Sequence, residues 1–197
     1  VEASTGKGDP AIKRIAEQRI IPCDEYGFVD IHLFESILKQ NNQNNKAGSI
    51  KYDENDNAIF ESKLEETLGI EMEQGIKVCI VNHCSNVTGA VQDVKELCRI
   101  AHKYGALFFL DISQSAGVMK VDVDGWDVDA VAFTGHKGLL GPQGTGGFYI
   151  KREISLKPLL YGGTGRDSSK IIYDDDYEYE VGNKNVCGIY GLNAGVK

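Results

Sequence analysis

Three short apolar segments, each followed directly by polar residues, constrain the fold of this chain more than any other feature. They are Val78–Val81, Ala106–Leu110 and Ala130–Phe133, and a segment with helical spacing, Val91–Tyr104, separates the first from the second. Apolar runs of this length that alternate with a helix are typical of a parallel sheet covered on both faces. The expected fold is therefore α/β, with three layers (α/β/α) and a mostly parallel sheet.

The expected helix over residues 91–104 has an apolar face, and Gly105 ends it. A fourth apolar run, Gly147–Ile150, follows the glycine-rich segment 141–147. Towards the N-terminus we expect a helix over residues 11–21 that runs into a short strand, and a second helix over 30–39 capped by Asp30. The apolar positions of the 91–104 helix are Val94, Leu97, Cys98 and Ala101.

Charge and cysteine usage exclude several classes of protein. The formal net charge is -8 and there is no concentrated basic stretch, so a nucleic-acid partner is not expected. No apolar run approaches the ~20 residues that span a bilayer, and residues 1–10 are too polar for a signal peptide. Five cysteines without a CxxC pair argue against a disulfide framework or a structural zinc site. Together these features favour a reducing compartment such as the cytoplasm.

Polar residues fall at the carboxyl ends of the successive apolar runs, where open α/β sheets bind their ligands. Each has an ordinary explanation on its own, because an acid that closes a strand is more often a turn former and a lysine is usually a solvated charge. Their convergence on one edge predicts a binding or catalytic site, in which a desolvated lysine could form a Schiff base with a carbonyl cofactor. The residues concerned are His83, Asn86, Asp111, Gln114, His136 and Lys137.

Four segments in this part of the chain occur in the order of the signatures of the class V aminotransferases. They resemble most closely the cysteine desulfurase and selenocysteine lyase branch of that family, whose members use pyridoxal 5'-phosphate (PLP) in a fold type I large domain. The resemblance covers roughly residues 11–197, with an interruption at about 41–75. The four segments are Asn82–Gly89, Asp111–Gln114, Thr134–Gly138 and Gly141–Gly147.

The resemblance implies a role for each residue at this edge. Lys137 would hold PLP through a Schiff base and then move protons at the substrate Cα. Asp111 would pair with the pyridine nitrogen, and Gln114 would bond to the phenolic oxygen O3′. Thr134 and His136 would bind the phosphate.

Two more roles follow from the same resemblance. Asn86 would lie close to O3′ and the substrate carboxylate, and His83 would sit near the substrate as a second catalytic residue. The implied reaction removes sulfur or selenium from cysteine or selenocysteine and leaves alanine. The implied partners are a second copy of the chain and a sulfur-acceptor protein. The alternatives are another class V aminotransferase, a kynureninase-like enzyme, or a truncated PLP-fold protein without activity.

The chain departs from the family pattern in several places. The Gly-Thr-Thr phosphate loop, the ring-stacking histidine and the small domain with its substrate-binding arginine and nucleophilic cysteine have no counterpart in it. Asn183 stands where the family usually has threonine, and neither Cys84 nor Cys187 matches the family nucleophile. We therefore expect residues 1–165 to form a partial PLP-binding large domain, with a loop or insertion at 41–75, and 166–197 to return towards a small domain. Such a chain alone is expected to be a poor desulfurase.

Overall fold

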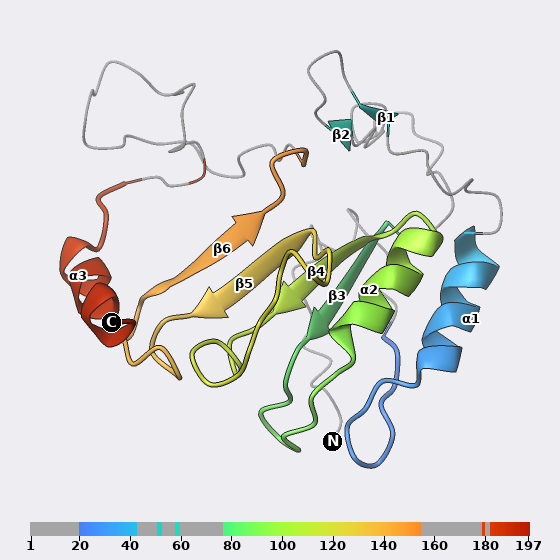
Figure 1. Ribbon diagram of the computed structural model, residues 1–197, viewed down its shortest axis with the longest axis horizontal. Helices are drawn as coiled ribbons and strands as arrows, with labels where there is room; N and C mark the ends of the chain where they lie inside the picture. Colours follow the sequence, from blue (N-terminus) through green and yellow to red (C-terminus); the bar gives the residue numbers. More distant parts are fainter. Residues whose placement is uncertain (1–19, 43–50, 53–57, 60–76, 155–178, 180–181) are drawn as a thin grey trace, which may run out of the picture.

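The computed structural model describes residues 20–42, 51–52, 58–59, 77–154, 179 and 182–197, and its centre is a four-stranded sheet (Figure 1). The strands are β3 (Val78–Asn82), β4 (Leu107–Asp111), β5 (Ala130–Thr134) and β6 (Gly146–Ile150), and they lie side by side in this order. The four apolar runs of the sequence thus correspond to the four strands to within a residue at each end.

The sheet is mixed but mostly parallel, as predicted. β3, β4 and β5 run parallel to one another, whereas β6 runs antiparallel to β5. A parallel neighbour needs a crossover of about a dozen residues or more, usually a helix. The connection from Gly135 to Thr145 contains no helix, and so the chain turns back on itself.

Two helices pack side by side over one face of the sheet (Figure 1). Helix α1 (Ile31–Asn42) begins after Asp30, whose carboxylate accepts hydrogen bonds from the amides of His32 and Leu33. Helix α2 (Val94–Lys103) is capped by Asp93, whose carboxylate accepts from the amide of Glu96. The predicted cap at Asp30 is confirmed, and the helix predicted over 91–104 begins three residues later than the spacing alone suggested.

The hydrophobic core lies between these helices and the sheet. Cys79 and Val81 of β3 are in register with Phe108 and Leu110 of β4, and all four are buried on the helix-covered face. The apolar face predicted for α2 is buried against them. On the other face Ile80 is 77% exposed, and no helix in the described ranges covers it. The second helical layer of the predicted three-layer arrangement is therefore not seen among the described residues.

The remaining elements are short. Strands β1 (Lys51–Tyr52) and β2 (Ala58–Ile59) pair antiparallel within the segment 41–75 that was expected to be a loop or insertion. Helix α3 (Val186–Gly195) lies beyond the end of β5 (Figure 1). The helix predicted over 11–21 falls almost entirely outside the described residues. All five cysteines are free thiols, and no helix in the described part is long and apolar enough to cross a membrane.

Candidate functional site

The polar residues predicted to form a site follow the carboxyl ends of β3, β4 and β5. These strands are parallel, and the register places Asn82, Asp111 and Ala132 in one row across them. Backbone hydrogen bonds between neighbouring strands extend one residue beyond this row. The amide of His83 donates to Asp111 O at 2.8 Å, and that of Ile112 donates to Ala132 O at 3.0 Å. The three strand ends therefore open onto the same edge of the sheet.

The turn after β4 and the loop after β5 touch each other at two glycines. A Cβ added to Gly117 would lie 2.7 Å from the carbonyl oxygen of Gly138, and one added to Gly138 would lie 2.5 Å from that of Ala116. Gly117 also has a φ of 78°, which side chains rarely tolerate. This close backbone approach requires glycine, and it brings the segment of Asp111 and Gln114 against the segment of Lys137.

Asp111 and Gln114 lie at this edge with few hydrogen-bond partners among the described residues. Asp111 is the last residue of β4 and is exposed, and its Oδ1 accepts a hydrogen bond of 2.8 Å from the amide of Ser113. The bond orients the carboxylate, and its second oxygen has no hydrogen-bond partner among the described residues. Gln114 follows in the same turn, half-buried, and its amide has no hydrogen-bond partner within the described part of the chain.

The end of β5 carries three further residues that were predicted at this edge. Thr134 is the last residue of the strand, and its hydroxyl oxygen is buried without a hydrogen-bond partner among the described residues. A buried hydroxyl without a partner is unfavourable, so this oxygen is suited to bonding a ligand. His136 is exposed and Lys137 is half-buried, and neither side chain takes part in an ion pair within the described ranges.

Helix α3 packs against the loop that contains Lys137. A Cβ at Gly135 or at Gly141 would meet Leu192 of α3, at 3.1 Å and 2.7 Å. The amide of Gly135 donates to Thr145 O and that of Gly141 donates to Gly135 O, both at 2.8 Å. The segment resembling the family's glycine-rich signature therefore closes a compact loop, and α3 holds the loop from outside.

The residues after β3 divide into two groups. Asn86 is exposed in a turn at the same edge as Asp111. His83, in contrast, is only 4% exposed, and its Nδ1 lies 2.8 Å from Ser115 Oγ. Its ring also contacts Trp126 edge-on, with the ring centroids 5.1 Å apart. The structure therefore groups Asn86 with the exposed polar residues and places the ring of His83 in the interior.

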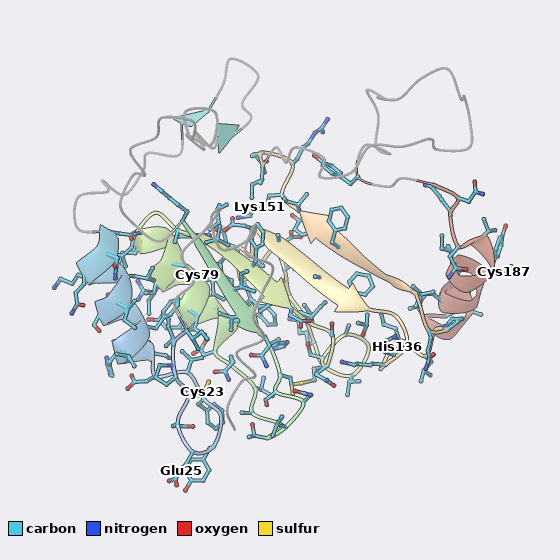
Figure 2. The ribbon with its side chains drawn as sticks, turned by 180° about the vertical axis from the view of Figure 1, so that it is seen from behind. Cys23, Glu25, Cys79, His136, Lys151 and Cys187 are labelled. Atoms are coloured by element: carbon cyan, nitrogen blue, oxygen red, sulfur yellow. The ribbon has the colours of Figure 1, made fainter. Side chains whose placement is uncertain are left out.

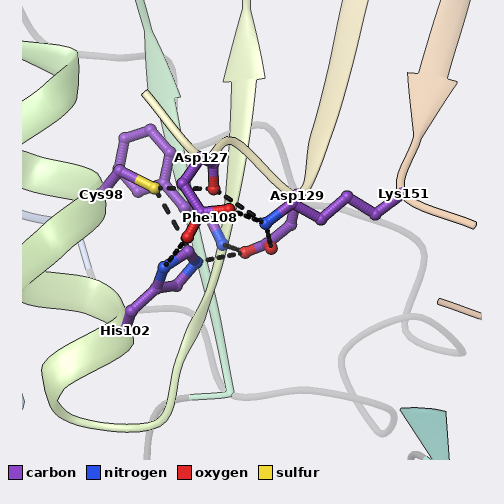
Figure 3. Close-up of polar contacts among 6 residues, drawn as sticks. All are labelled: Cys98, His102, Phe108, Asp127, Asp129 and Lys151. Atoms are coloured by element: carbon purple, nitrogen blue, oxygen red, sulfur yellow. Dashed lines mark hydrogen bonds and ion pairs between the residues drawn. The ribbon is translucent and has the colours of Figure 1, made fainter. Parts of the chain in front are cut away.

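A second polar cluster lies at the opposite end of the sheet, and no motif in the sequence pointed to it. Figure 2 shows His136 and Lys151 at the two ends of the sheet, and Figure 3 shows the cluster in close-up. Asp129, which precedes β5, accepts from His102 Nε2 and from the amide of Phe108 at 2.7 Å each, and from Lys151 Nζ at 2.9 Å. We call His102, Asp127, Asp129 and Lys151 the charged cluster.

The charged cluster shifts the titration of its own members. The hydrogen bond to Asp129, helped by the contact with Cys98, raises the pKa of His102 to about 10 against the opposing effect of burial. Burial alone would raise the pKa of Asp129, but hydrogen bonds from His102, Lys151 and the Phe108 amide outweigh it and hold that pKa below its usual value. His102 and Asp129 are therefore both charged at neutral pH.

Cys98, His102 and Asp129 do not form a nucleophilic triad, although these residue types suggest one. Cys98 is fully buried, and its Sγ approaches the same His102 nitrogen that bonds Asp129, at 3.8 Å. A working triad needs the two partners on different ring nitrogens and a nucleophile that the substrate can reach. The charged cluster is thus structural: it joins the end of α2 to the start of β5 and the end of β6.

Comparison with known proteins places the chain among the class V aminotransferases. The family model described as aminotransferase class-V matches residues 64–197. The probable cysteine desulfurase of Methanothermobacter thermautotrophicus is 43% identical over 131 residues, which cover 64% of this chain and 33% of that protein. That of Chlamydia muridarum is 37% identical over 153 residues, 72% of this chain and 36% of that protein. The chain thus spans about a third of the length of the curated relatives that it matches.

Solved structures give the same result for the fold. The apo structure of the cysteine desulfurase from Thermococcus onnurineus superposes with a TM-score of 0.64 at 30% identity, over 90% of this chain and 37% of that one. The cysteine desulfurase CsdA from Escherichia coli has a TM-score of 0.53 at 31% identity, over 61% of this chain and 31% of that one. The predicted α/β fold, that of the large domain of PLP-dependent transferases, is confirmed.

Proposed function

This chain belongs to the class V aminotransferase family, and on that premise we propose that it is the cofactor-binding part of a PLP-dependent cysteine desulfurase. The proposed reaction removes sulfur or selenium from cysteine or selenocysteine and leaves alanine. Relatives named cysteine desulfurase, at 43% and 39% identity, support this choice within the family. Because the chain spans about a third of those relatives, the proposal concerns the protein to which this part contributes.

The observation that carries the proposal is the buried hydroxyl of Thr134, which lies beside the loop of Lys137 without a partner among the described residues. A phosphate oxygen would satisfy this hydroxyl, and the exposed imidazole of His136 two residues later adds a second donor. The Lys137 amine takes part in no ion pair that the described part contains, so it is available to a carbonyl group. The residues present therefore fit PLP.

Each residue then has a specific task. Lys137 would hold the cofactor covalently and later move a proton at the substrate Cα. Asp111, oriented by the Ser113 amide, would keep the pyridine nitrogen protonated with its second oxygen. Gln114 and Asn86 would donate to the phenolic oxygen. When bound, PLP supplies an electron sink for the carbanion at Cα.

Absorbance with added PLP tests the proposal. Lysine-bound PLP absorbs at roughly 420 nm, and we expect this band in the wild-type chain and its loss in Lys137→Ala. Lys120→Ala is the matched control, because Lys120 is an exposed lysine between β4 and β5 whose ion-pair partner within the described part of the chain is Asp122, at the surface. A band that survives in Lys137→Ala would place the covalent link elsewhere and refute the assignment.

Product analysis separates the remaining alternatives. Cysteine or selenocysteine supplied to the PLP-loaded protein, together with a thiol that reduces the transferred atom, should give alanine, and the sulfur or selenium should appear as sulfide or selenide while the thiol is oxidised to its disulfide. Transamination of cysteine would instead indicate an aminotransferase, and cleavage of kynurenine a kynureninase-like enzyme. We also propose that the protein acts in the cytoplasm as a homodimer and passes sulfur to an acceptor protein. Sedimentation of the loaded protein tests the dimer.

A further inference from the structure

Asn86 lies in the turn of a narrow hairpin between β3 and α2. We call residues 83–92 the Asn86 hairpin. At its base the amide of Gln92 donates to His83 O at 2.9 Å. In its turn the hydroxyl of Ser85 accepts hydrogen bonds of 3.2 Å from the two amides that follow Asn86. Asn86 itself is exposed, and its side chain has no hydrogen-bond partner among the described residues, so the backbone of the hairpin sets where its amide group lies.

The side chain of Gln92 joins the base of this hairpin to a second turn, residues 23–29, which we call the bracing turn. Gln92 is 6% exposed. Its Nε2 donates to Gly27 O at 2.7 Å, and its Oε1 accepts from the amide of Val29 at 2.9 Å. This orientation of the amide satisfies both partners, because one is a carbonyl and the other an N–H. Two further amides of the bracing turn donate to Asp24 Oδ1 at 2.9 Å each, so the turn is itself well ordered by hydrogen bonds.

The bracing turn also touches the turn of the Asn86 hairpin directly. Figure 1 shows the two segments, in blue and green, at the same end of the sheet. Gly27 has a φ of 93°, and a Cβ added to it would collide with the hydroxyl of Thr88 and lie 3.2 Å from the Thr88 Cβ. That hydroxyl accepts from the amide of Ala90 at 3.2 Å. The bracing turn therefore contacts the hairpin at its base, through Gln92, and again two residues after Asn86.

We infer that Gln92 is a positioning residue: its two side-chain hydrogen bonds hold the Asn86 hairpin against the bracing turn and so keep the Asn86 amide at the cofactor edge. Replacement of Gln92 by a residue without an amide leaves Gly27 O and the Val29 N–H without this partner, which removes the contact at the base of the hairpin. The inference rests on the proposed function for the contact between Asn86 and PLP.

A double-mutant cycle tests whether Gln92 acts through Asn86. Asn86→Ala removes the proposed bond to the phenolic oxygen, so the Kd for PLP should rise by ~10-fold, the effect of one buried hydrogen bond. We expect Gln92→Ala to raise it by a similar factor. The double variant should then also bind ~10-fold more weakly than wild type, whereas independent effects would multiply to ~100-fold. A ~100-fold loss, or normal PLP binding by Gln92→Ala, would overturn the inference.

Two further variants control for effects on folding. Gln92→Met nearly keeps the length and volume of the side chain and removes both hydrogen bonds, so it replaces alanine in the same cycle if the alanine variant unfolds. Gln40→Ala removes an exposed glutamine near the end of α1 and should bind PLP as the wild type does.

The absorbance of bound PLP provides a signature that a loss of stability alone would not produce. A donor to the phenolic oxygen stabilises its negative charge, so loss of the donor raises the pH at which lysine-bound PLP gives up its proton. In the loaded protein the midpoint of the band at roughly 420 nm should therefore move up by about one pH unit in Asn86→Ala, and in the same direction in Gln92→Met. A midpoint that moves in Asn86→Ala and stays at the wild-type value in Gln92→Met would overturn the inference.

Amide hydrogen exchange in the chain without PLP separates this inference from the proposed function. The Val29 amide donates to Gln92, and the Gly89 amide donates to Ser85 O at 3.0 Å in the turn of the hairpin. Gln92→Met should accelerate exchange at both amides, and Gln40→Ala at neither. Faster exchange at Val29 with unchanged exchange at Gly89 would refute the positioning role. Failure of the wild-type chain to bind PLP, with the exchange result as expected, would count against the proposed function alone.

Discussion

The charged and polar groups at the two ends of the sheet differ in their burial and in their hydrogen bonds to the described residues. At the amino end of β5, Asp129 is 4% exposed and accepts hydrogen bonds from three donors. At the carboxyl end of β4, Asp111 is exposed and accepts one hydrogen bond from the described residues. The Thr134 hydroxyl, at the far end of the strand that follows Asp129, has no partner among the described residues. Within the described part of the chain, one end satisfies its polar groups, whereas the other has polar groups without partners, which we propose contact the cofactor.

Because of this difference, we expect the residues at one end of the sheet to determine mainly stability and those at the other end to determine mainly cofactor binding. Buried charges stabilise a fold only when every one of them is paired, and the charged cluster meets that condition. Groups that bind a cofactor must stay unpaired until it arrives, which costs stability in its absence. Substitutions at the amino end should therefore change unfolding, and substitutions at the carboxyl end should change binding.

The largest expected loss of stability is that of Asp129→Asn. Both carboxylate oxygens of Asp129 are used, so an amide in either orientation would direct its NH2 group at His102, Lys151 or the Phe108 amide. We expect the free energy of unfolding to fall by about 3 kcal/mol, the lower end for a broken buried ion pair, because His102 and Lys151 remain partly exposed. Urea unfolding of this variant beside Asp124→Asn, at an exposed loop position, measures the effect. A loss below ~0.5 kcal/mol would remove the distinction between the two ends.

The same substitution at the other end should leave stability intact. In Asp111→Asn the amide oxygen can still accept from the Ser113 amide, so we expect unfolding to change by less than ~0.5 kcal/mol. Alanine formation by the loaded protein should fall by ~100-fold or more, since the charge that would keep the cofactor nitrogen protonated is gone. Urea unfolding and a steady-state assay check the two parts. Strong destabilisation by Asp111→Asn would show that this carboxylate has a structural role.

The charged cluster should also make stability depend on pH. The pKa of His102 is about 10 in the folded chain, against 6.5 for a histidine in an unstructured peptide. The stabilisation by protonated His102 is therefore complete below pH 6.5 and is lost as the pH rises through 10. Between these values the free energy of unfolding should fall by at most about 1.4 kcal/mol per pH unit.

His102→Gln isolates this effect. Glutamine can keep the hydrogen bond to Asp129 but carries no titrating charge, so the difference in unfolding free energy between wild type and variant should shrink from about pH 7 to about pH 9. Urea unfolding across this range measures it. A constant difference would mean that His102 is not protonated in the folded chain.

Thr134→Val should increase stability and weaken binding. Valine has nearly the shape of threonine and removes the buried hydroxyl that has no partner in the described part. We expect the cofactor-free chain to gain about 1 kcal/mol of stability, and the Kd for PLP to rise by roughly 10-fold through loss of a phosphate contact. Thermal unfolding and PLP titration test the two effects. Destabilisation of the cofactor-free chain would mean that the hydroxyl has a protein partner.

Local sequence patterns were sufficient to predict the strands, helix α2 and the edge of the sheet at which the candidate site lies. Asp111 and Lys137 could be assigned to that edge because parallel strands end together. The antiparallel direction of β6 could also have been predicted, since the Gly135–Thr145 connection is too short for a usual crossover helix. The orientation of His83 could have been deduced as well, because alternation from Asn82 turns it to the buried side.

The charged cluster could not be predicted in this way. His102 lies on a helix, Asp129 precedes a strand, and Lys151 follows another strand. Each has the local sequence context of an ordinary surface charge, and only the packing of α2 against the sheet brings them together. The Thr134 hydroxyl, which has no partner in the described ranges, could not be predicted for the same reason, because burial and missing partners are properties of the packed structure.

We expect the smallest effects on stability and activity from substitution of two cysteines, one near each end of the sheet. Cys98 is fully buried and donates to Asp127 O at 3.3 Å, so Cys98→Ala should cost about 1 kcal/mol of stability through lost packing. Cys84 is half-buried beside the candidate site, and among the described residues its thiol makes long contacts alone, to Ser85 O and Gly89 O at 3.8 and 3.7 Å. Cys84→Ala should therefore change the free energy of unfolding by less than ~0.5 kcal/mol. It should leave the absorbance band of lysine-bound PLP and the rate of alanine formation unchanged. Loss of sulfur transfer in Cys84→Ala, with PLP still bound, would show that Cys84 is a nucleophile. The carboxyl end of the sheet would then contribute a catalytic residue as well as cofactor-binding groups.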